Sequence, residues 1–259
     1  MRIEYEIDFE PDVVRISDGD TKASISSVGF VPSPEMIKRR IFDFIYGEIA
    51  NEIAAAYGEY DDTRIEERSL SMIDSIMSLD IENPMRHIVI KAIHAASDFS
   101  IAPLVRYSSG FFSSFLNKLK KGCSIICDSE MVRAGIYSRP VLESNSVVCY
   151  LNDPRSKETA DKDGITRSAA GIKIALQENS NSVLVIGNSP TALHEAVRIL
   201  ALKKRYDIPI VGIPVGFVNT TRVKEQLVSS GLEYITLDGH RGGSPIAASI
   251  VNGFGRFLV

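Results

Sequence analysis

The sequence predicts an α/β protein with a doubly wound, mainly parallel sheet that carries helices on both faces. Two observations support this prediction. From about Thr63 onward, short runs rich in Val and Ile recur along the chain, and a segment with helical spacing of apolar residues follows each run. Because the runs are apolar throughout, without alternating polar residues, we expect strands that are buried on both faces between two layers of helices.

Five apolar runs are predicted to be strands: CSIICD (123–128), VVCYL (147–151), VLVIGN (183–188), IPIVGIPVGF (208–217) and EYITLDG (233–239). Helices are expected over RIEERSLSMIDSIM (64–77), from about Pro84, over TRSAAGIKIALQE (166–178) and over PTALHEAVRILALKKR (190–205). In folds of this class, ligands bind beyond the carboxyl ends of the strands. The loops that directly follow the strands are therefore the places where we expect the chemistry.

The first part of the chain differs from this pattern and is predicted to form an N-terminal α+β extension. We expect short strands over RIEYEIDF (2–9) and TKASISSVGF (21–30), which are separated by turn residues. The segment 32–60 is predicted to be a helix, because a proline lies near its start and its apolar residues recur at helical spacing. The predicted domains are therefore an extension over 1–60 and an α/β domain over 61–259.

Composition and charge bound the possible functions. Hydrophobic residues make up 44% and charged residues 24% of the 259 residues, which is enough apolar material for a sizeable core. The formal net charge of -4 gives no global electrostatic support to a nucleic-acid partner. We find no apolar run of the length that a membrane span needs, and the N-terminus lacks the apolar segment of a signal peptide.

Cysteine usage points to a cytoplasmic protein. The chain has three cysteines, Cys123, Cys127 and Cys149, with no CxxC pair and no nearby histidine. An odd number of cysteines in or beside strand-like runs is typical of small core residues in a reducing compartment. We therefore expect neither a disulfide framework nor a zinc site.

The loop IGNSPTAL (186–193) is a candidate anion site. Ser189 can cap the following helix, a proline suits the first helical position, and the backbone N–H groups near Asn188, Ser189 and Thr191 could receive an anion. An ordinary, well-capped connection would have the same sequence. Neither a GxGxxG fingerprint nor a nucleotide-binding P-loop is present, which weakens a nucleotide-binding interpretation.

The loop DGHRGGSPIAASI (238–250) favours an anion more strongly. Gly242 and Gly243 permit backbone conformations or close approaches that other residues do not, and Ser244 can cap the next helix. Arg241 adds a cationic fork that matches a carboxylate or phosphate. A glycine-rich turn with an exposed arginine is the alternative.

A third loop, GITRSAAGI (164–172), has the same character. Arg167 and Ser168 lie at a predicted helix start, where a carboxylate would meet both backbone N–H groups and a guanidinium. Taken alone, each of these loops is a weak signal. Their recurrence along one edge of the sheet indicates a ligand with several negative groups.

The helix predicted over 84–98 carries a histidine whose position can be judged from helical phasing. At about 100° per residue, His87, Lys91, His94 and Asp98 fall on one stripe, opposite a stripe of Met85, Val89, Ala92 and Ala96. His94 is therefore expected outside the buried stripe. A solvated polar face remains an alternative to a functional one. His87 and His94 lack a carboxylate at ligand spacing, so we expect no metal.

Seven stretches together resemble the precorrin-8X methylmutase (precorrin isomerase) family, including the cobalt-precorrin-8 methylmutases. They are IEERSLSMI, IHAASDF, DSEMVRAGI, GITRSAAGI, VIGNSPTAL, VGIPVGFVNTTRVKE and GHRGGSPIAASIVN. They occur in the family's order between about Thr63 and Asn252. The combination of VGIPVGFV with RGGSPIAA is distinctive.

The resemblance implies a cytoplasmic α/β isomerase of cobalamin biosynthesis, typically a homodimer, that moves a methyl group from C-11 to C-12 of a corrin precursor without a cofactor. His94 matches the histidine that protonates or stabilises the ring during this formal 1,5-sigmatropic shift. Ser69 matches a serine near the substrate. The substrate, a tetrapyrrole with many carboxylates, would be held by Lys91, Arg167 and Arg241, with N–H groups at Ser189 and Gly243 assisting.

The chain departs from the family at a few positions. Lys91 stands where arginine is frequent, and so keeps the charge but loses bidentate geometry. His240 stands where an arginine is common, and the residues after His94 read AASD. The rival functions are a non-catalytic carrier of corrinoid intermediates and a Rossmann-like nucleotide enzyme. No partner among nucleic acids or membranes is expected.

Overall fold

The computed structural model describes residues 6–10, 13–17, 22–26, 64–77 and 80–258. By its internal contacts, the chain divides into residues 1–63 and 64–259, and each part is described by itself. The first part contains an antiparallel sheet in the order β1-β2-β3, formed by β1 (Glu6–Glu10), β2 (Val13–Ser17) and β3 (Lys22–Ser26). Two of these strands overlap the predicted ones, whereas β2 was not predicted. The helix predicted over 32–60 lies outside the described residues.

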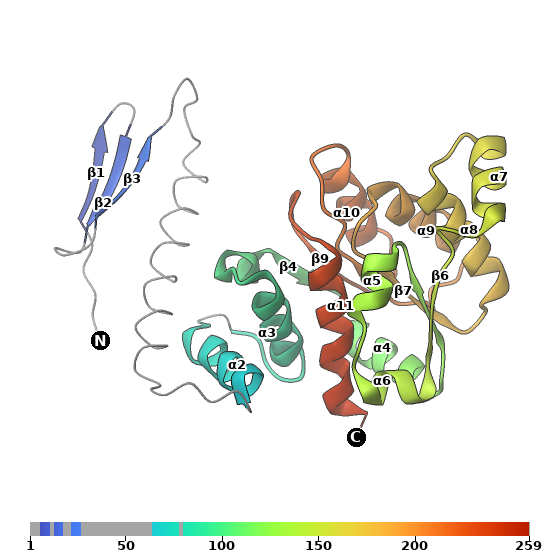
Figure 1. The fold of residues 1–259 in the computed structure, drawn as a ribbon, viewed down its shortest axis with the longest axis horizontal. Coiled ribbons are helices and arrows are strands. Elements are labelled where there is room, and N and C mark those ends of the chain that lie inside the picture. The colour runs from blue at the N-terminus through green and yellow to red at the C-terminus, as the bar shows by residue number, and fades with distance from the viewer. Residues whose placement is uncertain (1–5, 11–12, 18–21, 27–63, 78–79, 259) are drawn as a thin grey trace. The chain divides into compact units, whose positions relative to one another are not determined.

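The second part is built on a six-stranded sheet in the order β4-β9-β8-β7-β5-β6 (Figure 1). Its strands are β4 (Val105–Tyr107), β5 (Ser124–Cys127), β6 (Ser146–Cys149), β7 (Ser182–Ile186), β8 (Ile210–Gly212) and β9 (Tyr234–Leu237). All neighbouring strands are parallel except β4, which pairs with β9 in the antiparallel direction. The predicted α/β fold with a mainly parallel sheet is thereby confirmed.

Helices connect and cover the strands. They are α2 (Ile65–Ile76), α3 (Met85–Ala96), α4 (Phe111–Lys120), α5 (Glu130–Gly135), α6 (Arg139–Ser144), α7 (Pro154–Asp163), α8 (Arg167–Glu178), α9 (Pro190–Leu202), α10 (Thr220–Val228) and α11 (Ser244–Gly253), with 3₁₀ turns η2 (Phe99–Leu104) and η3 (Phe254–Phe257). No described helix is both long and apolar enough to cross a membrane.

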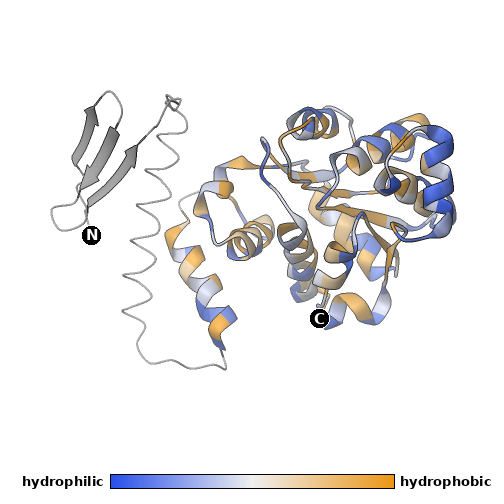
Figure 2. Ribbon diagram, turned by 45° about the horizontal axis from the view of Figure 1, so that its top comes forward, coloured by the Kyte–Doolittle hydropathy of each residue, from blue (hydrophilic) through white to orange (hydrophobic). Residues whose placement is uncertain are grey.

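The two faces of the sheet pack into two separate apolar clusters, because successive side chains of a strand point to opposite faces. Ile125 and Cys127 of β5 pack with α3, α4 and α11 on one face. Ile126, between them, packs with α8, α9 and α10 on the other face. Figure 2 shows that the strands are largely hydrophobic, whereas the peripheral helix α7 is hydrophilic. Helices therefore cover both faces, as the continuous apolar runs predicted.

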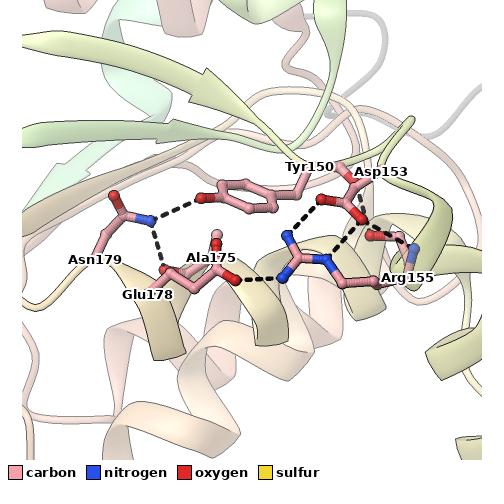
Figure 3. A network of polar contacts seen from close by, with 7 residues as sticks. Tyr150, Asp153, Arg155, Ala175, Glu178 and Asn179 are labelled. Atoms are coloured by element: carbon pink, nitrogen blue, oxygen red, sulfur yellow. Dashed lines mark hydrogen bonds and ion pairs between the residues drawn. The ribbon is translucent and has the colours of Figure 1, made fainter.

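A polar network fixes the start and end of the α7–α8 hairpin (Figure 3). The Arg155 guanidinium donates to the Asp153 carboxylate, with Nη2 to Oδ2 at 2.6 Å, and also to Glu178 at the end of α8. Asn179 Nδ2 donates to the Tyr150 hydroxyl at 3.3 Å. The guanidinium lowers the pKa of both the Asp153 and the Glu178 carboxyl groups. These exposed contacts hold α8, whose first residue is Arg167, against the end of β6.

One strand and two element ends differ from the sequence predictions. The strand β4, with the short sequence VRY, was not predicted. The strand predicted over 208–217 ends at Gly212, shortly before Pro214, which has no N–H to donate to a ladder. The histidine helix ends at Ala96, because Ser97 adopts a left-handed conformation with φ of 48°. The helical phasing that placed Asp98 on this helix is therefore wrong. Asp98 instead caps η2, where its carboxylate accepts the Ser100 N–H at 2.8 Å.

Candidate functional site

His94 lies near the end of α3 and is hydrogen-bonded to α2. Its Nδ1 atom is 2.8 Å from Ser69 Oγ, and both residues are half-buried. Among the residues that the structure describes, the other ring nitrogen, Nε2, has no hydrogen-bond partner. If the Ser69 hydroxyl donates to Nδ1, the imidazole carries its proton on Nε2. The contact therefore fixes the ring and leaves one nitrogen able to donate to a ligand.

Lys91 lies one turn before His94 but is not on a solvated face. Only 7% of Lys91 is exposed, and its ammonium pairs with the Glu66 carboxylate of α2. This hydrogen bond lowers the pKa of Glu66. Nearly all of the α3 circumference is buried, since α3 packs against α11 on one side and α2 on the other. If Lys91 also holds a substrate carboxylate, as predicted, its ammonium must bind that carboxylate and Glu66 at the same time.

Arg241 is tied to the segment that follows the histidine helix. Its Nη1 atom pairs with Asp98 and donates to Ser100 Oγ at 2.5 Å. The Asp98 carboxylate, which helical phasing placed beside His94, is thus bound instead to the loop at residues 238–243, which we call the RGG loop. This pairing brings Arg241 and Gly242 to the carboxyl end of α3, where they line a cleft of about 300 Å³ with Ala95.

The RGG loop approaches the chain after β8 so closely that a side chain would not fit. A Cβ on Gly242 would lie 2.4 Å from the Ile213 carbonyl oxygen. Gly243, with φ of 134°, donates its N–H to the same carbonyl at 3.0 Å, and therefore this N–H is already occupied. Gly242 is needed first for this packing, and Gly243 for its backbone conformation. Their predicted role as substrate contacts remains a prediction.

Lys224 of α10 is hydrogen-bonded to the backbone of the loop that contains Arg241. Its side chain is 2% exposed, and Nζ donates to the Gly239 carbonyl oxygen at 3.0 Å and to the Arg241 carbonyl oxygen. Burial lowers the pKa of Lys224 to about 8. This lysine was not identified as functional from the sequence. The structure shows it as a residue that positions the backbone of Arg241.

The lowered pKa predicts a specific pH dependence of stability. Because the folded pKa of Lys224 is about 8 and the ordinary value is 10.5, the unfolded state binds more protons between these values. The free energy of unfolding should therefore rise with pH across that window, by on the order of 2 kcal/mol. Urea denaturation at about pH 7.5 and pH 10 should show this rise, and Lys224→Met should lack it. Parallel pH dependence of the two proteins would contradict the prediction.

The predicted anion loop at residues 186–193 is already filled by a carboxylate of the chain itself. Asp128, at the end of β5, is 2% exposed and accepts backbone N–H groups from Gly187 at 3.1 Å, Asn188 at 2.9 Å and Ser189 at 2.6 Å. Burial raises the pKa of Asp128, and the three donors oppose that rise. The N–H groups expected to assist substrate binding at Ser189 are therefore satisfied internally.

This contact lies at a topological switch point. The chain continues from β5 outward to β6 and then returns to β7 on the other side of β5, so β5 and β7 diverge in their connections. Such a crevice is where open α/β sheets bind ligands. The Asp128 carboxylate occupies its inner end, so a ligand would bind further out, over the exposed Asn188 and Thr191.

Three hydroxyl groups connect the starts of α8 and α9 near the exposed side chains of Asn188 and Thr191. Thr191 Oγ1 lies 2.7 Å from Thr166 Oγ1 and 2.9 Å from Ser189 Oγ. Thr166 caps α8 and Ser189 caps α9, as the sequence predicted for Ser189, whereas the cap predicted for Ser244 is wrong, because Ser244 is the first residue of α11 and Gly243 precedes it. Arg167 is exposed and has no hydrogen bond or ion pair within the described residues, while Ser168 is half-buried.

The predicted residues therefore fall into two groups along one edge of the sheet. The first group surrounds α3: Ser69, Lys91 and His94 lie where α3 meets α2, and Arg241 and Gly242 line the cleft beside Ala95 at the end of α3. The second is at the starts of α8 and α9: Arg167, Ser168, Asn188, Ser189 and Thr191. The start of α11 links them, since Ser244 Oγ lies 3.4 Å from Ser129 Oγ and Gly187 packs against Ser244 Cα. Over the described part of the chain, no cluster of three metal-ligand side chains occurs.

The sequence interpretation missed Glu66, Asp128 and Lys224 as partners. A signal for Glu66 existed, because it lies three residues before Ser69 and so on the same face of its helix. No local signal revealed the other two. Asp128 and Ser189 are 61 residues apart, and a lysine in an amphipathic helix gives no indication that it is buried.

Comparison with known proteins gives one consistent result. A family model described as precorrin-8X methylmutase matches residues 64–256. The cobalt-precorrin-8 methylmutase of Methanocaldococcus jannaschii is 36% identical over 166 residues, which are 64% of this chain and 76% of that protein. The precorrin-8X methylmutase of Sinorhizobium sp. is 34% identical over 205 residues, 76% of this chain and 98% of the relative.

Solved structures agree. A structure titled precorrin-8X methylmutase related protein has a TM-score of 0.71 and 73% identity, and the match covers 73% of this chain and all of that one. A precorrin-8x methyl mutase from Thermus thermophilus has a TM-score of 0.68 and 26% identity, with 75% of this chain and 97% of that chain covered.

Proposed function

The chain belongs to the precorrin-8X methylmutase family, and we propose that it moves a methyl group from C-11 to C-12 of precorrin-8 or cobalt-precorrin-8, with His94 as the catalytic residue. Membership makes it an intramolecular methyl-shifting isomerase of cobalamin biosynthesis. The single observation that supports the role of His94 is its geometry. The ring is held through Nδ1 by Ser69 at 2.8 Å, so that Nε2 is left for the substrate.

The reaction needs little from the protein beyond a proton and a fixed pose. As the methyl group leaves C-11, electron density shifts within the macrocycle, and a donor at Nε2 of His94 stabilises that change. The Ser69 hydroxyl keeps the ring in the required tautomer and orientation. Holding the substrate in one orientation in a cleft that excludes water supplies much of the remaining acceleration.

The carboxylates of the substrate have two receptors on this edge of the sheet. The Arg167 side chain is exposed and has no ion pair or hydrogen bond among the described residues, so its guanidinium can donate to a carboxylate of the substrate. Arg241 is held by Asp98 and Ser100, which fix its guanidinium near the end of the histidine helix. The hydroxyl groups of Thr191 and Ser168 and the amide of Asn188 add hydrogen-bonding groups between them.

The wider setting of the reaction is also part of the proposal. Residues 61–259 form the methylmutase domain, to which 1–60 is an extension, and the enzyme acts as a homodimer in the cytoplasm. Its three cysteines are free thiols, and burial raises the pKa of Cys123 to about 12, which suits small core residues in a reducing compartment. Sedimentation or light scattering of the full chain tests the dimer.

A spectral assay separates this function from that of a carrier. Purified full-length chain at catalytic concentration should convert precorrin-8 to hydrogenobyrinic acid or cobalt-precorrin-8 to cobyrinic acid, with many turnovers per protein. A carrier would bind the substrate stoichiometrically and leave its spectrum unconverted. Offering the metal-free and the cobalt-containing substrate in parallel identifies which one is natural.

A further inference from the structure

An exposed apolar loop stands between two clefts of the methylmutase fold. In the loop that follows β8, Val215, Phe217 and Val218 are 44%, 89% and 78% exposed. The Phe217 ring stacks on the His240 ring of the RGG loop, with centroids 5.0 Å apart and an interplanar angle of 25°. We call Val215, Phe217 and Val218 the apolar crest. Side chains this large and apolar, gathered on one exposed loop, are typical of a binding surface.

The crest has a cleft on each side. Val215 and His240 line the cleft of about 300 Å³ that Arg241 and Gly242 also line, close to the histidine helix. Val218 lines a second cleft, of about 530 Å³, between α9 and α10. A ligand that covers the crest would therefore reach both clefts at once.

The chemistry of the second cleft favours a carboxylate. Its polar lining residues are Thr191, His194, Asn219, Arg222 and Gln226, and none of its lining residues is acidic. His194 Nδ1 lies 3.1 Å from Gln226 Oε1. Within the described residues, the exposed Arg222 has neither an ion pair nor a hydrogen bond, so its guanidinium is available. Thr191 continues the hydroxyl cluster at the starts of α8 and α9.

We propose that the cleft between α9 and α10 is a carboxylate subsite, in which Arg222 binds a peripheral acid group of the macrocycle while the apolar crest packs against the ring. This inference rests on the proposed function. A broad ring that is apolar at its centre and acidic around its edge matches an apolar crest that has Arg222 in the cleft on one side and Arg241, paired with Asp98, in the cleft on the other. Arg222 then contributes to substrate affinity and not to the methyl shift itself.

Two variants that each remove one positive charge test the subsite. Arg222→Gln removes the guanidinium of the cleft, and Lys203→Gln removes an exposed ammonium at the opposite end of α9 from Thr191. The probes are cobyrinic acid and its neutral heptamethyl ester, titrated against full-length protein. We expect Arg222→Gln to raise the Kd for the acid about tenfold, Lys203→Gln to change it less than about twofold, and neither to change the Kd for the ester.

Each outcome decides the matter. Two outcomes would overturn the subsite while leaving the proposed function intact. Either both variants have the same Kd for cobyrinic acid, or Arg222→Gln weakens the ester as much as it weakens the acid. If the wild-type chain neither binds cobyrinic acid nor converts precorrin-8, the proposed function itself fails. Phe217→Ser should weaken the ester as well as the acid. If Phe217→Ser changes the oligomeric state and leaves both Kd values unchanged, the crest contacts a second copy of the chain and the proposed packing is wrong.

Discussion

His94→Ala is expected to lower the rate of conversion by about 10²-fold or more, while the affinity for the product stays within a few-fold of wild type. The imidazole is the group that stabilises the redistribution of charge in the ring, whereas the ligand is held by other residues. Rapid mixing of excess enzyme with precorrin-8 measures this step, and titration with the product measures binding. His94 is half-buried, so its truncation leaves no large cavity in the core, and we expect the variant to stay folded.

Ser69→Ala is the matched control, because it removes only the hydroxyl that contacts Nδ1. The imidazole remains but is free to rotate and to change its tautomer, so the expected loss is smaller, about tenfold. Unfolding curves of both variants should match that of wild type. Conversion by His94→Ala at the wild-type rate would show that this histidine is not the catalytic group.

Asp128→Ala is expected to lower the free energy of unfolding by about 3 kcal/mol. The substitution leaves the N–H groups of Gly187, Asn188 and Ser189 without their acceptor in a buried crevice. Each unsatisfied buried donor costs about 1–3 kcal/mol, and water that enters the new cavity recovers part of the sum. Urea denaturation at neutral pH measures the loss.

Asp128→Asn is the control for this prediction. The amide keeps one oxygen that can accept N–H groups, but its NH₂ group now faces a donor, so we expect a loss smaller than that of Asp128→Ala. If Asp128→Ala and wild type unfold at the same urea concentration, the carboxylate does not support the loop. The same loop would then be open to an external anion, as the sequence alone had suggested.

The sheet could be predicted because burial on both faces leaves a direct mark on the sequence. Continuous Val and Ile runs identified β5, β6, β7, β8 and β9. The edge strand β4 carries no such mark, since three residues with an exposed arginine in the middle are too few and too polar. The end of α3 at Ala96 was also hidden, because Ser97 adopts the left-handed conformation without a glycine to announce it.

The site was predictable only where a residue type alone defines its chemistry. The sequence located the histidine and the loops that surround it, and the structure brings His94 and Ser69 together. Nothing in the sequence indicates that Asp98 binds Arg241 or that Asp128 fills the loop at residues 187–189, and the pairing of Lys91 with Glu66 is signalled only by the position of Glu66 one turn before Ser69. Each of these contacts joins segments that are distant in sequence, and each one changes which donors remain for a ligand.

Following the migrating methyl group itself tests whether this chain catalyses the shift from C-11 to C-12. Precorrin-8 labelled with carbon-13 in its C-11 methyl group is incubated with a catalytic amount of the full-length chain, and the product is examined by NMR. We expect the label to appear in full on C-12, with no exchange into solvent or other methyl positions, and His94→Ala to block its transfer. Tight binding of labelled substrate, with the methyl group still on C-11 after long incubation with the wild-type chain, would contradict it.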